Sequence, residues 1–287
     1  MKILVTGANG QLGTEIRNIA ALEPREDCEF FFTDVEELDI TDADAVEKMV
    51  KELSVDIVIN CAAYTAVDKA EGDVDKARAL NAEAPALLAK AVAERGGEII
   101  HVSTDYVFDG RACTPYTEDM PAAPCSVYGS SKLEGERGVV EANPKHVIVR
   151  TAWLYSPYGN NFVKTMLRLG RERERIGVVF DQVGSPTYAA DLARAIVQIA
   201  LSKEKTYGIF HYSNEGAISW YDFTKAIHRL AGIQNCDVQP ILSDQYPTPA
   251  KRPAYSVFSK DKIKRVYGVK VPYWEDSLQE CLERLKQ

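Results

Sequence analysis

Short runs of apolar and β-branched residues alternate, in the first half of the chain, with longer segments of helical periodicity. Each short run predicts a strand, and each amphipathic segment between two runs predicts a helix. Such alternation indicates an α/β fold with a doubly wound parallel sheet of the Rossmann type, whose ligands lie beyond the carboxyl ends of the strands. The predicted strands span 2–6, 28–33, 56–60, 98–102 and 146–150, and the predicted helices span 11–21, 42–53 and 74–95, with another beginning near Tyr128.

The second half of the chain departs from this alternation after residue 151. We expect a helix from Phe162, a strand at 178–179, a helix near 188–201, a strand at 208–211, a helix from Ser219 and two terminal helices. This pattern predicts a second, smaller mixed α/β lobe. A dinucleotide-binding domain would cover 1–150 with a return segment near 175–201, and a substrate-binding lobe would cover 151–174 and 202–287.

Composition and charge narrow the class of protein. Hydrophobic residues make up 46% of the chain and charged residues 26%, which is typical of a globular protein with a full core. The net charge of -8 argues against a nucleic-acid partner, which would require a basic surface. The six cysteines include no Cys-x-x-Cys pair, and no apolar run approaches 18 residues. We therefore expect free thiols, no membrane partner and a cytoplasmic location.

A glycine-rich turn follows the first predicted strand directly. Gly7, Gly10 and Gly13 are spaced as G-x-x-G-x-x-G, with Gln11 and Leu12 at the start of the next helix. Glycines in this setting allow a pyrophosphate to approach backbone N–H groups at a helix N-terminus. The turn therefore predicts a dinucleotide site.

Asp34 ends the second predicted strand, about twenty residues beyond the glycines, where a carboxylate can hydrogen-bond an adenosine ribose. The alternative is an ordinary turn residue at a strand end. The residues that follow, Val35 to Leu38, add two acids and no arginine for a 2′-phosphate. The sequence thus predicts that NADH is used at least as efficiently as NADPH.

Small and polar residues follow two further strands. Cys61, Ala62 and Ala63 come after the third strand, where a cofactor would cross the sheet, and Ser103, Thr104 and Asp105 end the fourth. Because the carboxyl ends of parallel strands share one edge, we expect these residues near one another.

Tyr128 and Lys132 are four residues apart and lie on one face of a predicted helix. A free phenol has a pKa of about 10, and a nearby cation lowers that pKa toward the working pH, as proton donation to a carbonyl requires. Tyr221 and Lys225 have the same spacing but lie far from any predicted strand end, so we interpret them as packing residues.

Four motifs agree in order and spacing: the glycine turn, 103–105, the Tyr128 to Lys132 pair, and an aromatic segment at Trp153. Together with the segments 103–110, 182–187 and 252–253, they resemble the extended short-chain dehydrogenase/reductase family over nearly the whole chain. The resemblance implies an enzyme that uses NADPH or NADH to reduce the 4-keto group of dTDP-4-dehydro-L-rhamnose, giving dTDP-L-rhamnose.

The resemblance also implies a role for each matching residue. Tyr128 would donate the proton, Lys132 would hold the nicotinamide ribose and lower the tyrosine pKa, and Thr104 would hydrogen-bond the reacting oxygen. The substrate would contact Thr65, Thr104, Asp105, Tyr106 and Trp153. The cofactor would contact Gly7, Gly10, Gln11, Leu12, Gly13, Asp34, Asp39, Ile40, Ala62, Ala63, Tyr64 and Lys132.

Some members of the family bind magnesium through acidic residues at a dimer contact, and a homodimer is among the assemblies that the resemblance allows. Glu15 is available here, but Ala189 and Ala190 offer no second acid beside Asp191, so no metal is expected.

Two alternatives remain. A sugar-nucleotide dehydratase or epimerase shares the fold, but a dehydratase places Asp-Glu after the strand-end threonine, whereas Asp105 precedes Tyr106 here. The second alternative is a non-catalytic regulatory subunit, which an intact set of Thr104, Tyr128 and Lys132 disfavours.

Overall fold

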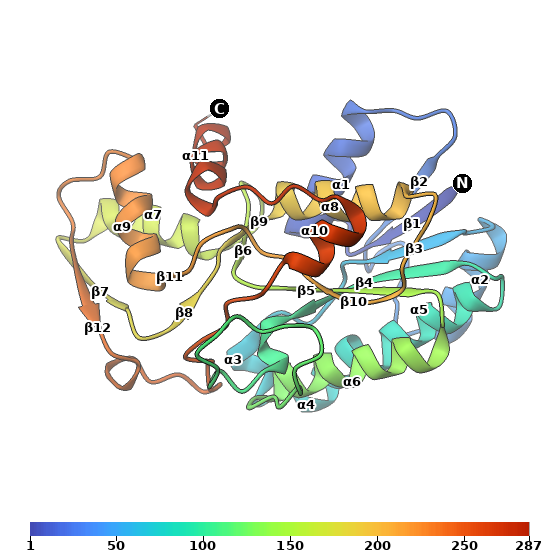
Figure 1. Ribbon diagram of the computed structural model, residues 1–287, viewed down its shortest axis with the longest axis horizontal. Coiled ribbons are helices and arrows are strands. Elements are labelled where there is room, and N and C mark those ends of the chain that lie inside the picture. The colour runs from blue at the N-terminus through green and yellow to red at the C-terminus, as the bar shows by residue number, and fades with distance from the viewer. Residues whose placement is uncertain (287) are drawn as a thin grey trace.

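The computed structural model describes residues 1–286 and has a six-stranded, wholly parallel sheet at its centre (Figure 1). The strand order is β10-β5-β4-β3-β1-β2, so the chain reverses direction across the sheet between β1 and β3. This order confirms the predicted doubly wound fold and places a ligand-binding crevice at that reversal. The strands are β1 (Lys2–Thr6), β2 (Glu29–Thr33), β3 (Ile57–Asn60), β4 (Glu98–Thr104), β5 (His146–Thr151) and β10 (Gly208–His211).

Helices cover both faces of the sheet (Figure 1). Alternate residues of β1 point to opposite faces, so Ile3 and Val5 join one buried cluster while Leu4 joins the other. This explains why the strands read as continuous apolar runs. The first cluster packs against α1 (Gln11–Leu22), α8 (Ala189–Leu201) and α10 (Asp261–Tyr267), and the second against α2 (Ala43–Glu52), α5 (Ala84–Ala93) and α6 (Val127–Ala142).

The helix predicted over 74–95 is divided in the structure. It consists of α4 (Val74–Arg78), the π-helical turn η1 (Ala79–Glu83) and α5, and the chain leaves it through Gly96, whose φ is 75°. Within the π turn, the buried Asn81 amide donates to Ser131 Oγ at 3.1 Å and to the Tyr64 carbonyl at 3.1 Å. The extra residue of the turn therefore directs a polar side chain toward the loop that follows β3.

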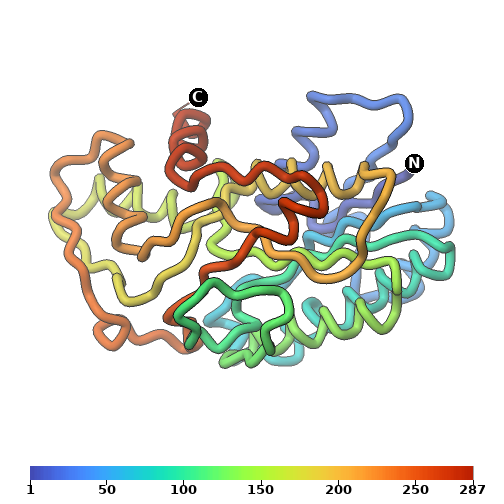
Figure 2. Tube along the Cα trace, viewed as in Figure 1, coloured from blue at the N-terminus to red at the C-terminus, as the bar shows by residue number. Residues whose placement is uncertain are grey.

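A smaller lobe lies beyond the carboxyl edge of the sheet, and the chain enters it more than once (Figure 2). Its core contains Val163, Phe223, Trp274 and Leu278. Side chains cap several of its helices, as where Asn161 accepts the Lys164 N–H at 3.1 Å. The lobe contains α7 (Phe162–Glu172), α9 (Trp220–Leu230), α11 (Trp274–Arg284), β6 (Leu154–Tyr155), β7 (Arg175–Val179), β8 (Val183–Gly184), β9 (Thr187–Tyr188), β11 (Ile218–Ser219) and β12 (Asp237–Ile241). The remaining short elements of the chain are α3 (Val67–Ala70), η2 (Asp105–Val107) and η3 (Ser243–Gln245).

Three elements, β7, β10 and α10, lie in a different part of the fold from the one predicted for segments 175–201 and 202–287. β7 pairs with β12 in the lobe, whereas β10 completes the central sheet beside β5 and α10 packs against that sheet. Strand pairing between distant segments leaves no local pattern, so periodicity could not assign them. We propose that the dinucleotide-binding domain also includes β10 and α10, and that the lobe includes β7.

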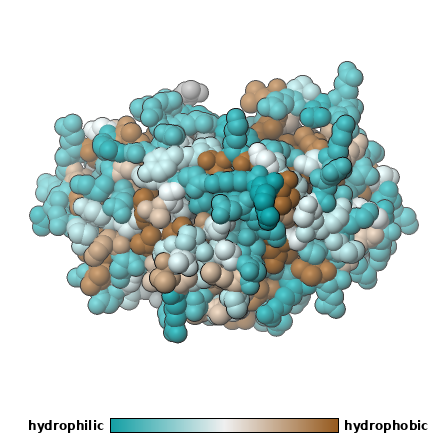
Figure 3. Space-filling model, viewed as in Figure 1, coloured by the Kyte–Doolittle hydropathy of each residue, from teal (hydrophilic) through white to brown (hydrophobic). Residues whose placement is uncertain are grey.

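The surface is largely hydrophilic, in keeping with a charged-residue content of 26%. Hydrophilic side chains predominate on the face shown in Figure 3, with apolar residues scattered among them. In the described part of the chain, residues 1–286, no helix is both long and apolar enough to span a membrane.

Candidate active site

A cleft of about 910 Å³ runs along the carboxyl edge of the sheet, between the ends of the strands and the lobe. It brings together residues that the sequence separates by more than one hundred positions, from the glycine turn to Trp153. The predicted site residues that line it are Gly7, Gly10, Gln11, Leu12, Gly13, Asp34, Asp39, Ile40, Ala62, Ala63, Thr65, Thr104, Asp105, Tyr106, Tyr128, Lys132 and Trp153.

The glycine turn has the close backbone packing that a dinucleotide site requires. Gly7 has φ 64°, and a Cβ there would lie 2.7 Å from the Ala62 Cα. A Cβ at Gly13 would collide with the Gly7 carbonyl oxygen. Both glycines are therefore needed for the turn to form beside the end of β3, and Gln11 opens α1 immediately after the turn.

Asp34 is held in place beside the turn. Its carboxylate accepts the Asn9 N–H at 2.8 Å and the Val35 N–H at 2.9 Å. No arginine follows Asp34 closely in the sequence, but α1 brings Arg17 to the glycine turn. Arg17 Nη2 donates to Asn9 Oδ1 at 3.3 Å, and the guanidinium lies over the Phe32 ring. A cation therefore lies beside the turn that Asp34 anchors, which spacing along the chain could not reveal.

Tyr64, expected at the cofactor, lies outside the lining of this cleft. Its hydroxyl donates to Asp73 at 3.3 Å, and its backbone N–H donates to Asn81 Oδ1 at 2.8 Å. The π turn that carries Asn81 draws this part of the loop toward α4, so the predicted contact of Tyr64 with the cofactor stays a prediction.

The hydroxyl groups of Thr104 and Tyr128 meet at the centre of the cleft. Thr104 Oγ1 donates to Asp105 Oδ1 at 3.0 Å and accepts the Tyr106 N–H at 3.3 Å, and its hydroxyl lies near enough to the Tyr128 phenol to influence the phenol's pKa. The Tyr106 ring packs edge-on against Tyr128 with centroids 5.4 Å apart. Ser126 caps α6 by accepting the Gly129 N–H at 3.1 Å, which fixes the turn that carries the phenol.

Lys132 is buried behind the phenol and is held from the sheet side. Its Nζ donates to the Val102 carbonyl at 2.7 Å and lies 3.5 Å from His101 Nε2. Asn60 Oδ1 accepts hydrogen bonds from Thr6 and Ala62, so its amide nitrogen faces His101 Nδ1 at 3.1 Å and donates to it. A neutral ring then carries its proton on Nε2, and that N–H cannot accept a bond from the Lys132 ammonium.

The pKa values of the pair differ from the sequence expectation. Burial raises the pKa of Tyr128 to about 12, and the neighbouring Thr104 hydroxyl opposes this rise only in part. Burial also lowers the pKa of Lys132 to about 8, although the charge of Glu136 opposes this. Lys132 points to Val102 rather than to the phenol in this structure. The expected direct lowering of the tyrosine pKa is therefore wrong for this arrangement of side chains.

An aromatic side chain, Trp153, lines the far side of the cleft. Trp153 has φ 50°, a strained conformation for a bulky residue, and its indole stacks on Trp220 with centroids 3.5 Å apart. Arg252 binds Asp68 through two hydrogen bonds of 2.8 and 3.0 Å, which ties the proline-rich segment to α3. The ring of Trp153 is thus pre-positioned by packing.

The acids that could hold a divalent cation already have cationic partners. Both oxygens of Glu15 accept hydrogen bonds from Arg284, at 2.9 and 3.1 Å. Asp191 accepts from Arg194 at 2.8 Å and from Asn214 at 2.7 Å. Across residues 1–286 no group of three or more His, Cys, Asp or Glu side chains could hold a metal. Within the chain, Glu15 and Asp191 are therefore already paired with arginine side chains.

Several lining residues were missed by the sequence reasoning. Asn160, Leu80 and Thr151 line the cleft, but they follow no motif, and only the fold brings them to it. Tyr221 and Lys225 lie on α9 of the lobe and do not line the cleft, in agreement with their assignment to packing.

Comparisons with known proteins agree over the full length. The RmlD substrate binding domain family model matches residues 1–287. A dTDP-4-dehydrorhamnose reductase from Aggregatibacter actinomycetemcomitans is 42% identical, covering 97% of each chain. A crystal structure of a dTDP-4-dehydrorhamnose reductase from Clostridium acetobutylicum is 48% identical with a TM-score of 0.95 and complete coverage of both chains. Another from Bacillus anthracis, in complex with NADP, is 41% identical with a TM-score of 0.92 and 99% coverage of each.

Proposed function

The chain belongs to the RmlD substrate binding domain family, and we propose that it reduces the 4-keto group of dTDP-4-dehydro-L-rhamnose with NADPH or NADH. The product would be dTDP-L-rhamnose. The observation that carries this proposal is the meeting of Thr104, Tyr128 and Lys132 in one cleft with the glycine turn. The names of the relatives, which match nearly the whole chain, support the same reaction.

The nicotinamide supplies the hydride when it is bound. We propose that Gly7, Gly10, Gln11, Leu12 and Gly13 bind its pyrophosphate through their backbone, because α1 begins at this turn. Asp34, Asp39 and Ile40 lie along the same edge for the adenosine, and Ala62 and Ala63 lie where the chain leaves β3.

Tyr128 donates the proton to the sugar oxygen in this proposal. The Thr104 hydroxyl lies beside the phenol, so an oxygen that contacts both groups is oriented and polarised at the point of proton transfer. With a pKa raised by burial, the phenol stays protonated at neutral pH and is ready to act as the acid.

Lys132 has three N–H donors, and the Val102 carbonyl takes one of them. The others can hold the hydroxyl groups of the nicotinamide ribose. A bound ribose would also link the ammonium to the phenol, which supplies the electrostatic coupling that direct contact does not.

We propose that the sugar nucleotide contacts Thr65, Asp105, Tyr106 and Trp153. Tyr106 follows Asp105 and packs on Tyr128, where a dehydratase would need a carboxylate to deprotonate a carbon. The phenol of Tyr106 cannot do this at neutral pH, because burial raises its pKa well above the usual value. The geometry thus favours a reductase over a dehydratase.

A cytoplasmic location and a homodimeric assembly are further parts of the proposal, and both rest on the family resemblance. Light scattering after size-exclusion chromatography measures the assembly.

The test is to follow NADPH absorbance with dTDP-4-dehydro-L-rhamnose made in a coupled reaction, and to identify the product by NMR. Formation of dTDP-L-rhamnose at the rate of NADPH loss is the expected result. Binding of a partner protein without any turnover would support the regulatory-subunit alternative instead.

A further inference from the structure

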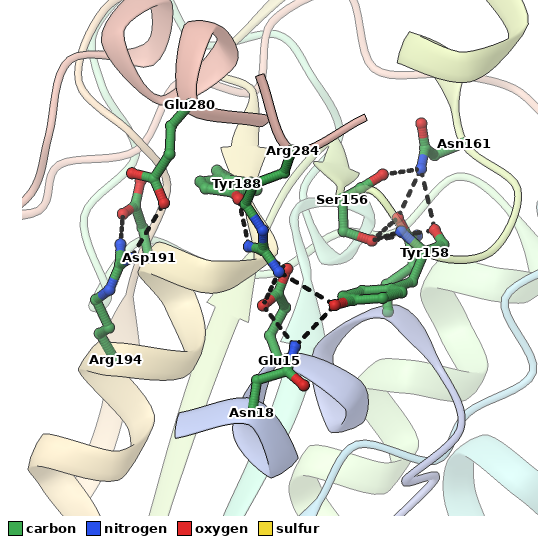
Figure 4. Close-up of polar contacts among 11 residues, drawn as sticks. Glu15, Asn18, Ser156, Tyr158, Asn161, Tyr188, Asp191, Arg194, Glu280 and Arg284 are labelled. Atoms are coloured by element: carbon green, nitrogen blue, oxygen red, sulfur yellow. Dashed lines mark hydrogen bonds and ion pairs between the residues drawn. The ribbon is translucent and has the colours of Figure 1, made fainter. Parts of the chain in front are cut away.

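Arg284, the last residue of α11, joins three segments that are far apart in the sequence (Figure 4). Its guanidinium donates to Glu15 on α1 through both terminal nitrogens. It also donates to the Tyr188 hydroxyl at 2.6 Å and to the Tyr158 hydroxyl at 3.2 Å. The C-terminal helix therefore contacts both the helix of the glycine turn and the loop over residues 156–161.

Glu15 needs this partner because its side chain is only 3% exposed. A buried carboxylate without a cation is strongly unfavourable, and a two-point guanidinium contact is the geometry that satisfies both of its oxygens. Arg284 comes from the same chain, so the charge of Glu15 is neutralised without an added ion.

The 156–161 loop connects this ion pair to the cofactor turn. The Tyr158 hydroxyl accepts hydrogen bonds from Arg284 and from Asn18 on α1, the latter at 2.9 Å (Figure 4). At the other side of the loop, Ser156 Oγ and Asn161 Nδ2 donate to Gln11 Oε1 at 3.1 and 3.0 Å. Gln11 is the first residue of α1, and the loop residues 159 and 160 line the cleft.

We propose that Arg284 is a positioning residue for the dinucleotide: with Glu15 and Tyr158 it fixes the 156–161 loop over the glycine turn. This inference rests on the proposed function for the identity of the ligand. Its prediction is specific, because loss of Arg284 should weaken the cofactor complex and leave the proton-transfer groups around Tyr128 in place.

If Arg284 only docked α11, loss of the other arginine that tethers this helix, Arg194, should weaken cofactor binding equally. α11 is anchored independently by Leu278, Cys281 and Leu282 in the lobe core, and by Arg194, which donates to Glu280 at 3.1 Å. Removal of Arg284 should therefore leave α11 docked, while it leaves Glu15 without its cation and releases the 156–161 loop. Arg194 provides the matched control, since it tethers the same helix but contacts neither Glu15 nor the loop.

The experiment measures the Kd of NADPH by its fluorescence in the binary complex, together with kcat and both KM values. Arg284→Gln should raise the Kd and the cofactor KM roughly fivefold to twentyfold, with kcat at saturating cofactor within about threefold of wild type. Arg194→Gln should change none of these. Equal Kd values for wild type and Arg284→Gln, or an equal increase in Arg194→Gln, would overturn the inference.

Two further variants keep the test decisive if Arg284→Gln folds poorly. The double variant Glu15→Gln with Arg284→Gln leaves no uncompensated carboxylate, and the raised Kd should persist in it because the contact with Tyr158 is still missing. Tyr158→Phe should raise the Kd in the same direction by a smaller factor. A wild-type Kd in both variants would refute the positioning role.

Chelation tests the claim that Arg284 supplies the charge. Treatment of the wild-type protein with EDTA should leave the Kd of NADPH and the assembly unchanged, and a loss restored by magnesium would contradict the claim. Failure of the wild type to bind NADPH at all would instead refute the proposed function, so the two failures are distinguishable.

Discussion

Asp105→Asn should stabilise the protein while it impairs substrate binding. Asp105 is 2% exposed, and burial raises the pKa of its carboxyl to about 6, while the neighbouring hydroxyls of Ser256 and Thr104 oppose the shift. The folded state thus binds a proton more readily than the unfolded state, whose carboxyl titrates near 4. Stability must therefore fall as the pH rises from about 4 through 6.

The magnitude follows from the same pKa values. A difference of about two pKa units at ~1.4 kcal/mol each gives a loss of at most about 3 kcal/mol at pH 7.5, and about half of that at pH 5. Asparagine resembles the protonated acid and keeps an acceptor for Thr104, so the variant avoids this loss.

Urea denaturation of wild type and Asp105→Asn at pH 5 and pH 7.5 measures the effect. The free energy of unfolding should be higher for the variant, and the difference should grow with pH. The KM for the sugar nucleotide should rise at the same time if Asp105 contacts it. A difference in stability that is absent at pH 7.5, or that shrinks as the pH rises, would refute the reasoning.

The remaining predictions concern cofactor choice, the buried ammonium and the lobe aromatic. The wild type should use NADH at least as efficiently as NADPH. Asp34→Ala should move the ratio of kcat/KM values toward NADPH by up to about tenfold, because a charge that repels a 2′-phosphate is removed. Arg17→Ala should move this ratio toward NADH, and unchanged ratios would show that neither residue contacts the ribose. Lys132→Met should lower kcat by roughly 10²- to 10⁴-fold and raise the cofactor KM. Lys225→Met, on the exposed face of α9, should change neither value, and an equal loss of kcat in both variants would contradict the catalytic role of Lys132. Trp153→Ala should raise the sugar KM more than it lowers Tm, and a large loss of Tm at constant KM would make the stack on Trp220 a core contact only.

Features carried by local pattern could be predicted from the sequence. The bounds of β1 and β10 match the expected strands, and the glycine turn lies between β1 and α1 as predicted. These signals are local because apolar alternation and glycine freedom act within a few residues.

Features that depend on distant contacts could not be predicted. Glu15 and Arg284 are separated by 269 positions, and nothing in either helix indicates their pairing. The π turn around Asn81 could not be predicted either, because no residue type within 79–83 marks such a turn. The direction of the Lys132 side chain depends on Val102 and on the orientation of His101, which the fold alone determines.

The central claim is that hydride goes to the sugar carbonyl carbon while Tyr128 protonates its oxygen. The most direct test uses NADPH deuterated at nicotinamide C4 with dTDP-4-dehydro-L-rhamnose, comparing wild type, Tyr128→Phe and the control Tyr221→Phe. Deuterium should appear at sugar C4 in the wild-type and Tyr221→Phe products, and Tyr128→Phe should be slower by roughly 10²- to 10⁴-fold with nearly unchanged cofactor affinity. Near-normal turnover in Tyr128→Phe, or wild-type product without deuterium at C4, would contradict the account.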